Sequence, residues 1–268
     1  KLAWYTIDEV FYKPSRPSNI TADDISLPYV RPIEEQEIRP NKDIPEGQAQ
    51  KIREFNIAYY PSERGPYNYD TLSSYSAGLN PDGTLRSPET RWGGIMRKLE
   101  STDFEATNIE YIEFWLMDPF IENPYHSGGK LYFNLGEVSE DILRDGRKSF
   151  ENGLPTSAEV VDVDSTIWGR VPRLQAVVNA FSNDPEARVY QDVGYDGLSS
   201  NDEANYHQQF LQKIQNQVEQ QTYNKIAQDP SADDFVYFRS LDYDQNDIKV
   251  VDRYKNYNNA ERNSSVVS

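Results

Sequence analysis

Residues 109–117 place the strongest constraint on the fold, because apolar side chains occupy both alternating faces of this run. In a strand, Ile112, Phe114 and Leu116 would share one face, and Trp115 would lie on the other. A strand that is apolar on both faces is typical of the centre of a sheet that is covered on both sides. The sequence therefore predicts a central strand here, with Trp115 packed in the core.

A second alternating run, at residues 130–136, predicts a neighbouring strand of the same sheet. Leu131, Phe133 and Leu135 would point inward from this strand. The pair favours a mainly β structure with a jelly-roll-like β-sandwich as its core. The opening residues Leu-Ala-Trp-Tyr are also strand-like, and shorter strands are expected at residues 55–60, 234–239 and 247–253.

The clearest helical pattern covers residues 203–228. Tyr206, Phe210 and Ile214 recur at every fourth position, opposite a face rich in glutamine, asparagine and lysine. Asp229-Pro230 would end the helix, because the residue before a proline is disfavoured in the helical conformation. One long amphipathic helix is therefore expected in this part of the chain.

The chain divides into three parts by composition. Residues 1–50 contain repeated prolines and charges with little periodicity, which predicts an extended N-terminal arm. Residues 51–170 would form the β-sandwich-like domain. Residues 171–268 would form a helical section with a short β tail, either separate or packed with the preceding domain as one unit. The predicted class is α+β, mainly β, and further short helices are expected at residues 139–143 and from Pro172.

Composition excludes several classes of function. The formal net charge of −17 would repel a nucleic-acid backbone or an anionic membrane face, so neither is expected as a partner. Because cysteine is absent, disulfides and thiolate-bound metal sites are excluded. No apolar run approaches the length of a membrane helix, and the first residues do not form a signal peptide.

Catalysis is not predicted either, because the sequence contains no nucleophile elbow, Walker loop, dinucleotide fingerprint or HExxH motif. Its two histidines, His126 and His207, are far apart in the chain. His126 is expected in an exposed loop, and His207 on the polar face of the long helix. The abrupt ends of the sequence indicate a piece of a longer polypeptide.

Residues 192–203 resemble a twelve-residue calcium loop. Asp192 would take its first position, Asp196 the fifth, Ser200 the ninth and Glu203 the closing twelfth. The third position is Gly194, which offers no side-chain ligand. The alternative is a glycine-rich turn that leads into the helix, so calcium is the only cofactor that the sequence suggests.

Other acidic residues carry less information. The cluster at residues 242–247 lacks the glycine and the distal glutamate of a calcium loop, which favours a solvated loop. Asp162 and Asp164 are expected on an edge strand or turn. A glycosidase needs two carboxyl groups that converge in a cleft, and a chain with 44 acidic residues contains many pairs by composition alone.

Several consecutive phrases resemble one known family, the SprA/Sov proteins. These phrases cover most of the chain, and the resemblance is weakest at residues 13–50 and 230–268. The longest are KLAWYTID at 1–8, PSERGPYNYD at 61–70, RWGGIMR at 91–97, NIEYIEFWLMDP at 108–119 and LYFNLGEVSEDIL at 131–143, with shorter ones at 146–155, 168–172 and 191–198.

The resemblance implies a function in protein transport. SprA/Sov proteins are outer-membrane translocons of the type IX secretion system of Bacteroidetes bacteria, and some members are needed for gliding motility. Full-length members resemble a large β-barrel with folded insertions, so this chain would be a soluble insertion that shapes or caps the export pore. The expected partners are other secretion-system proteins, secreted cargo and the rest of the parent barrel. The expected location is the outer membrane, on the extracellular side, with the periplasmic side left open.

A carbohydrate-binding module of a cell-surface protein is the alternative interpretation. The pair of strands at residues 109–117 and 130–136 is similar to those of galactose-binding jelly rolls, and the tyrosine-rich composition would suit sugar stacking. This similarity concerns the fold only, and a fold does not establish ligand binding.

Overall fold

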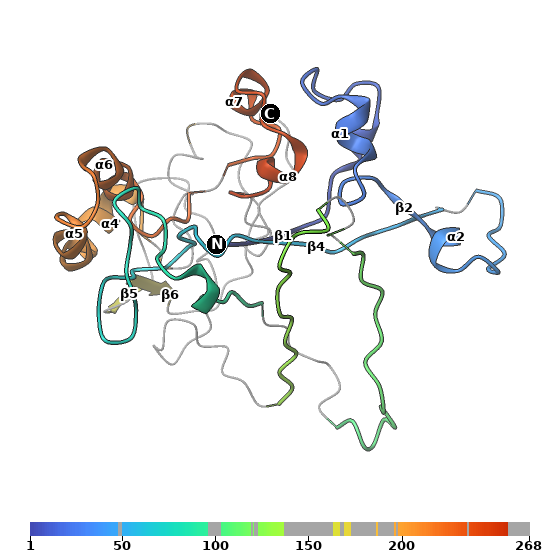
Figure 1. The fold of residues 1–268 in the computed structure, drawn as a ribbon, viewed down its shortest axis with the longest axis horizontal. Helices are drawn as coiled ribbons and strands as arrows, with labels where there is room; N and C mark the ends of the chain where they lie inside the picture. The colour runs from blue at the N-terminus through green and yellow to red at the C-terminus, as the bar shows by residue number, and fades with distance from the viewer. Residues whose placement is uncertain are drawn as a thin grey trace.

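The computed structural model describes residues 1–47, 50–95, 103–118, 120, 123–136, 163–166, 169–172, 186, 196, 198–234 and 236–256. These residues form short helices and antiparallel pairs of short strands (Figure 1). The strands are β1 (Leu2–Tyr5), β2 (Ile33–Glu34), β3 (Lys51–Ile52), β4 (Asn56–Tyr59), β5 (Val163–Thr166) and β6 (Gly169–Pro172). The helices are η1 (Glu9–Tyr12), α1 (Ala22–Ser26), α2 (Glu35–Ile38), η2 (Pro88–Thr90), α4 (Ser200–Tyr206), α5 (Gln208–Ile214), α6 (Gln220–Gln228), α7 (Leu241–Gln245) and α8 (Val250–Arg253).

Strands β1 and β4 form the central ribbon, and both were expected from the sequence. Trp4 pairs with Ile57, and Leu2 pairs with Tyr59. Successive side chains alternate across the ribbon, so the alanine and tyrosine of β1 are buried on the opposite face from Leu2 and Trp4. The remaining strand pairs are β2 with β3 and β5 with β6.

The first core lies against the buried face of β1. Tyr254 stacks on Tyr5, with ring centroids 4.4 Å apart, and on Phe238 at 5.1 Å. Its hydroxyl oxygen accepts a hydrogen bond of 2.8 Å from the backbone N–H of Asp8. This core therefore joins the beginning of the chain to residues more than two hundred positions later. Its buried members are Ala3, Tyr5, Ile7, Phe11, Ile20, Val30, Phe238, Val250 and Tyr254.

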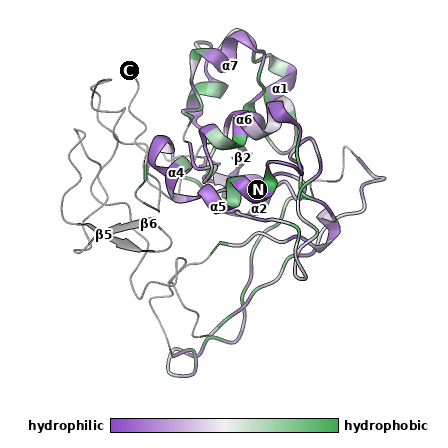
Figure 2. Ribbon diagram, turned by 90° about the vertical axis from the view of Figure 1, so that its left-hand side faces the viewer, coloured by the Kyte–Doolittle hydropathy of each residue, from purple (hydrophilic) through white to green (hydrophobic). Residues whose placement is uncertain are grey.

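The second core is formed by α5, α6 and the turn that precedes η2. Leu79 and Leu85 form an isolated bridge in this turn and are both buried. The helices carry hydrophobic residues among hydrophilic ones, as amphipathic helices do (Figure 2). The buried members of this core are Leu79, Leu85, Phe210, Leu211, Ile214, Val218 and Ile226.

The predicted long helix is wrong, because residues 200–228 form the three short helices α4, α5 and α6. His207 separates the first two, with backbone angles φ −97° and ψ 26°. Its ring stacks on Tyr69, with centroids 4.2 Å apart, so a contact outside the helix accompanies the break. The chain turns again before α6, where the backbone N–H of Glu219 donates to the carbonyl of Pro81 at 2.8 Å. Helix α6 ends before Asp229, as the proline signal predicted.

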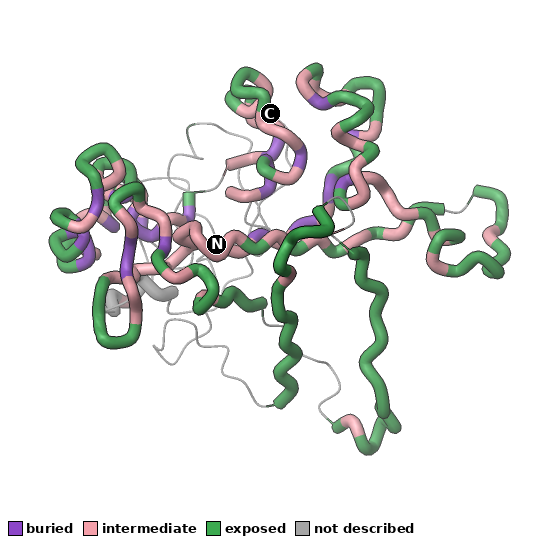
Figure 3. The backbone as a smooth tube through the Cα atoms, viewed as in Figure 1, coloured by how far each residue is buried: buried purple, intermediate pink, exposed green. Residues whose placement is uncertain are grey.

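The predicted jelly-roll-like β-sandwich is also wrong. Residues 109–117 and 130–136 are extended but belong to no strand in the part of the chain that the structure describes. Trp115, expected in the core, is 75% exposed, and Tyr132 is 71% exposed. Figure 3 shows both segments as exposed along their length. Among the described residues no strand pairs with them, and a strand forms only where another strand takes its backbone hydrogen bonds.

The short β tail is replaced by helices. Residues expected as strands lie next to α7 or within α8. The spacing explains the difference, because Val250, Arg253 and Tyr254 lie on one side of a helix and all three are buried. Pro172, expected in the first turn of a helix, is instead the last residue of β6. The helix expected at 139–143 and the continuation after Pro172 lie outside the described residues.

The first thirty residues, expected as part of an extended arm, supply Phe11, Ile20 and Val30 to the first core. The division into parts at residues 50 and 170 remains a prediction. Within the described residues, no helix combines the length and the apolar character that crossing a bilayer requires.

Candidate functional site

Three carboxylates converge inside the molecule, and we call Asp196, Glu203 and Asp233 the acidic cluster. One carboxylate oxygen from each lies within 4.8 Å of the others. Asp196 is 0% exposed and Glu203 is 1% exposed. Burying several carboxylates together is costly unless protons or cations offset their charge. The cluster is therefore the strongest candidate for a functional site among the described residues.

Each member is positioned by a different local structure. Asp196 precedes α4, and its Oδ1 accepts a hydrogen bond of 3.0 Å from the backbone N–H of Leu198. Glu203 lies within α4, which begins at Ser200. Asp233 follows the turn that ends α6, and its Oδ2 accepts a hydrogen bond of 3.0 Å from the hydroxyl of Tyr67.

Ser231 links the cluster together. Its backbone N–H donates to Oε2 of Glu203 at 2.9 Å, and its hydroxyl donates to Oδ2 of Asp196 at 2.7 Å. The hydroxyl of Tyr69 lies 2.8 Å from the same serine oxygen. Because Ser231 is fully buried, a substrate would reach this hydroxyl only if the surrounding structure opened.

His207 lies at the edge of the cluster, although the sequence suggested a polar helix face. Its Nε2 is 3.0 Å from the hydroxyl of Tyr69 and 3.6 Å from Oδ2 of Asp196.

A second group of carboxylates adjoins the first. Asp229, Asp233 and Asp234 also have oxygens within 4.8 Å of one another. The hydroxyl of Ser200 donates to Oδ1 of Asp234 at 3.2 Å. Through this contact the start of α4 is tied to the segment that follows α6.

Burial governs the protonation of these groups. Burial is the main cause that raises the pKa of Glu203 to about 8; the nearby charges of Asp196 and Asp229 contribute to this rise, and the hydrogen bond from Ser231 opposes it. Burial also raises the pKa of Asp229. In the absence of a bound cation, Glu203 therefore holds a proton near neutral pH.

Arg64 lies beside the cluster but donates to backbone carbonyls. Its guanidinium hydrogen-bonds the carbonyl oxygens of Asp229, at 3.0 Å, and of Pro230. It also lies over the ring of Phe210, with 5.6 Å between its Cζ and the ring centroid. Burial lowers the pKa of Arg64, an effect that the nearby carboxylates counteract. Arg64 thus supports the turn after α6 and reduces the negative potential there.

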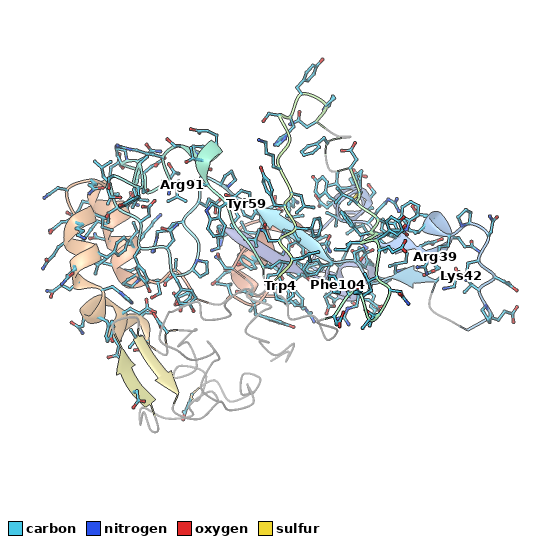
Figure 4. The ribbon with its side chains drawn as sticks, turned by 90° about the horizontal axis from the view of Figure 1, so that it is seen from below. Trp4, Arg39, Lys42, Tyr59, Arg91 and Phe104 are labelled. Carbon is cyan, nitrogen blue, oxygen red and sulfur yellow. The ribbon has the colours of Figure 1, made fainter. Side chains whose placement is uncertain are left out.

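An open groove of about 710 Å³ borders the cluster. Trp4, Tyr59 and Arg91 line one part of it, and Asp233 and Asp234 line another. Figure 4 shows Trp4 and Tyr59 on the ribbon of β1 and β4, with Arg91 nearby. Asp233 is therefore the member of the cluster that borders this groove.

The structure brings together part of the calcium loop suggested by the sequence. Asp196 and Glu203 are joined in the cluster, and Ser200 contacts the adjoining carboxylate Asp234. Asp192 lies outside the described residues. Asp233 completes the cluster from a distant position in the chain, and no local sequence pattern predicted it.

The other candidates have simpler surroundings. His126 is exposed, as expected, and its Nδ1 accepts a hydrogen bond from the backbone N–H of Gly128. Asp244, in the second acidic run, forms an ion pair of 2.7 Å with the buried Arg253. Asp164 lies in β5, and Asp162 lies outside the described residues.

Chemically, the acidic cluster is suited to a hard divalent cation. Calcium prefers oxygen ligands at about 2.3–2.6 Å, so two ligands on opposite sides of one ion lie up to about 5 Å apart. The spacing of the three carboxylates falls within this limit. A cation would replace the proton of Glu203 and offset the remaining negative charges.

Comparison with known proteins identifies one family. A model described as a motility related/secretion protein, SprA_N, matches residues 209–268. This match confirms the resemblance to the SprA/Sov family, and it includes residues 230–268, where the quoted phrases were weakest. No curated protein matches the chain.

Proposed function

From this match to a motility- and secretion-related family, we propose that the chain is a non-catalytic folded segment of an outer-membrane protein-secretion translocon. In this proposal it shapes or caps the export pore of a type IX system and contacts partner or cargo proteins. The observation that carries the proposal is the family match at residues 209–268.

The packing supports a structural function for the matched segment. Its first part supplies Phe210 and Ile214 to the second core, and its later part supplies Phe238 and Tyr254 to the first. In both cores these residues pack against segments that precede residue 90. The family segment is therefore built into a larger folded unit, as expected for part of a scaffold.

The carbohydrate-binding alternative is not supported. It rested on a jelly-roll-like pair of strands at residues 109–117 and 130–136, and the described residues contain no such sandwich. The abundance of tyrosine alone does not favour a sugar ligand over packing.

Deletion tests the translocon proposal. Residues 1–268 would be replaced by a short flexible linker in the parent protein, and export of a cargo protein would be measured in the bacterium. The parent must remain at its normal level in the outer membrane, as checked by immunoblotting. Loss of export at a normal parent level is expected, whereas unchanged export and unchanged surface assembly would refute the proposal.

Protease added to intact cells tests the location. The proposal places the segment on the extracellular side, so cleavage within residues 72–75, an exposed loop region, is expected without cell lysis. Cleavage only after the outer membrane is opened would place the segment in the periplasm.

We also propose that the acidic cluster binds calcium. Asp196 and Glu203, predicted from the loop spacing, converge with Asp233, which also borders the groove. A bound ion would fix the start of α4 to the turn after α6. The thermal test of this proposal is argued in the Discussion.

A further inference from the structure

Two exposed segments extend from the body of the molecule, and we call residues 109–117 and 130–136 the first and second leg of an arm. Figure 1 shows them as long traces that leave the region of β1 and β4, and Figure 3 shows them exposed. All their side chains with large apolar groups are exposed, unlike those of the two cores. These are Ile109, Tyr111, Ile112, Phe114, Trp115, Leu116 and Met117 in the first leg, and Leu131, Tyr132, Phe133 and Leu135 in the second.

One ring contact joins the two legs. The rings of Phe114 and Phe133 have centroids 5.2 Å apart. Near this contact, Trp115 is 75% exposed and Tyr132 is 71% exposed. The two legs therefore present large aromatic side chains to solvent.

The backbone of the arm is free to accept a further strand. Among the described residues, no hydrogen bond joins the backbone of residues 110–117 or 130–136 to another segment. The first leg has no proline or lysine, two residues that commonly protect an exposed strand edge, and its only charged residues are Glu110 and Glu113. The second leg begins with Lys130. The first leg is therefore the less protected of the two against a further strand.

The exposed area and the charge indicate what covers the arm. Its five aromatic side chains alone expose on the order of 600 Å², and a standard protein interface covers about 800 Å² on each partner. The first leg contains two acidic residues, Glu110 and Glu113. The second leg contains one basic residue, Lys130. A second copy is disfavoured, because each chain has a net charge of −17. An apolar strand of a different protein matches this surface better.

We propose that the arm is a docking site for another protein of the envelope assembly, which adds a β-strand along the free edge of the first leg. Main-chain hydrogen bonds would supply affinity, and the alternating apolar side chains would supply specificity. This docking proposal rests on the proposed function in one respect only, which is that the partner is sought in the cell envelope.

Site-specific photocrosslinking in the full-length parent protein tests the arm. A benzophenone amino acid would replace Trp115 or Tyr132, and in the control it would replace Tyr75, which is 99% exposed and lies outside both legs. Crosslinks from the first two positions to the same second polypeptide are expected, and none to it from position 75. Crosslinks only within the chain, to a second copy or to lipid would overturn the proposal, as would no crosslink at all.

A charge substitution provides the second measurement. With the crosslinker at position 132, Trp115→Glu is expected to lower the crosslinked yield roughly tenfold or more, as for loss of an aromatic anchor in an interface. The matched Tyr75→Glu should leave the yield unchanged. Thermal unfolding of the purified chain should be the same for both variants, because both side chains are exposed. An unchanged yield with Trp115→Glu would refute the docking site.

The outcomes separate the arm from the proposed function. Loss of export on deletion, without any crosslink from the arm, would refute the docking site but not the translocon function. A specific crosslink to another envelope protein, with export unaffected by deletion, would refute the translocon function but not the docking site.

Discussion

The backbone N–H of Ser231 donates a 2.9 Å hydrogen bond to Oε2 of Glu203, although the two residues are 28 positions apart. Both residues are buried. The bond ties α4 to the turn after α6, and the same serine uses its hydroxyl to hold Asp196. The ionisation of Glu203 therefore affects a contact between two segments, and pH should report on it.

Glu203→Gln should flatten the pH dependence of stability. The pKa of Glu203 is raised to about 8 in the folded protein from an ordinary value of 4.5. Between these values the folded state binds more protons than the unfolded state, so stability falls as pH rises and levels off above about 8. Glutamine keeps an acceptor for Ser231 but does not titrate. Thermal unfolding measured from pH 5 to pH 9 in a chelator should show a smaller decline for the variant.

The control for this measurement is Glu89→Gln, because Glu89 is exposed on η2. Glu89→Gln should show the same decline of thermal stability with pH as the wild type. The Glu203→Gln variant should keep part of the pH dependence of stability, because burial also raises the pKa of Asp229. If Glu203→Gln and the wild type declined in parallel, the raised pKa of Glu203 would be disproved.

Calcium should stabilise the chain through the acidic cluster. A ligand that binds only the folded state adds about 2.7 kcal/mol at a concentration one hundred times its dissociation constant. The melting temperature should therefore rise in calcium relative to a chelator. Asp196→Asn and Asp233→Asn should each abolish most of the rise, and Glu89→Gln should preserve it.

Asp192→Asn distinguishes the two descriptions of the site. Loss of the calcium response would show that the whole loop predicted from the sequence binds the ion. An unchanged response would restrict the site to the cluster. Identical melting temperatures in calcium and chelator for the wild type would reject calcium binding altogether.

The sequence predicted those parts of the site whose signal is local. Asp196 and Glu203 were found from their spacing within one loop, and the end of α6 from Asp229-Pro230. Ser231 and Tyr69 could not be found in this way, because their contacts cross 35 and 138 positions respectively. Such contacts depend on how distant segments pack, and no local spacing encodes them.

The fold was predicted less well for a related physical reason. The four-residue period of residues 206–218 fits one long helix or several short ones, and only the contact of His207 with Tyr69 marks the break. Alternation at residues 109–117 shows that both faces are apolar, but it does not specify a partner strand. By contrast, β1 and β4 were predicted, and each has its partner within the described residues.

Phe11→Ala should destabilise the first core strongly. Phe11 is fully buried and lies near Phe238 and Tyr254, with ring centroids 5.8 and 6.2 Å away. Truncation of a buried phenylalanine typically costs about 3–5 kcal/mol. Urea denaturation should show a loss of this size, and Tyr75→Ala should stay within about 0.5 kcal/mol of the wild type because its side chain is exposed. A small effect of Phe11→Ala would contradict the described core.

Removal of residues 1–30 should expose the later part of the family segment. Phe238, Val250 and Tyr254 pack against residues in this range, whereas Phe210 and Ile214 pack in the second core. Hydrogen exchange of a chain that begins at residue 31 should show lost protection at residues 238–254 and retained protection in α5 and α6. Equal protection in both regions would mean that the family segment folds without the N-terminal residues.

Gly83→Ala should cost more than Gly47→Ala, although both glycines have a positive φ, of +84° and +86°. An added Cβ at Gly83 would lie 2.6 Å from Cγ2 of Thr222 in α6. An added Cβ at Gly47 would meet no atom within 4 Å. The backbone strain of about 1–2 kcal/mol is common to both variants, so the additional cost at Gly83, of about 1–3 kcal/mol, measures the close packing of this turn on α6. In a double-mutant cycle followed by urea denaturation, Thr222→Ser should recover part of that additional cost, because it removes the methyl group that the new Cβ would strike. Equal losses for the two glycine variants, or no recovery with Thr222→Ser, would show that this turn does not pack on α6 as described.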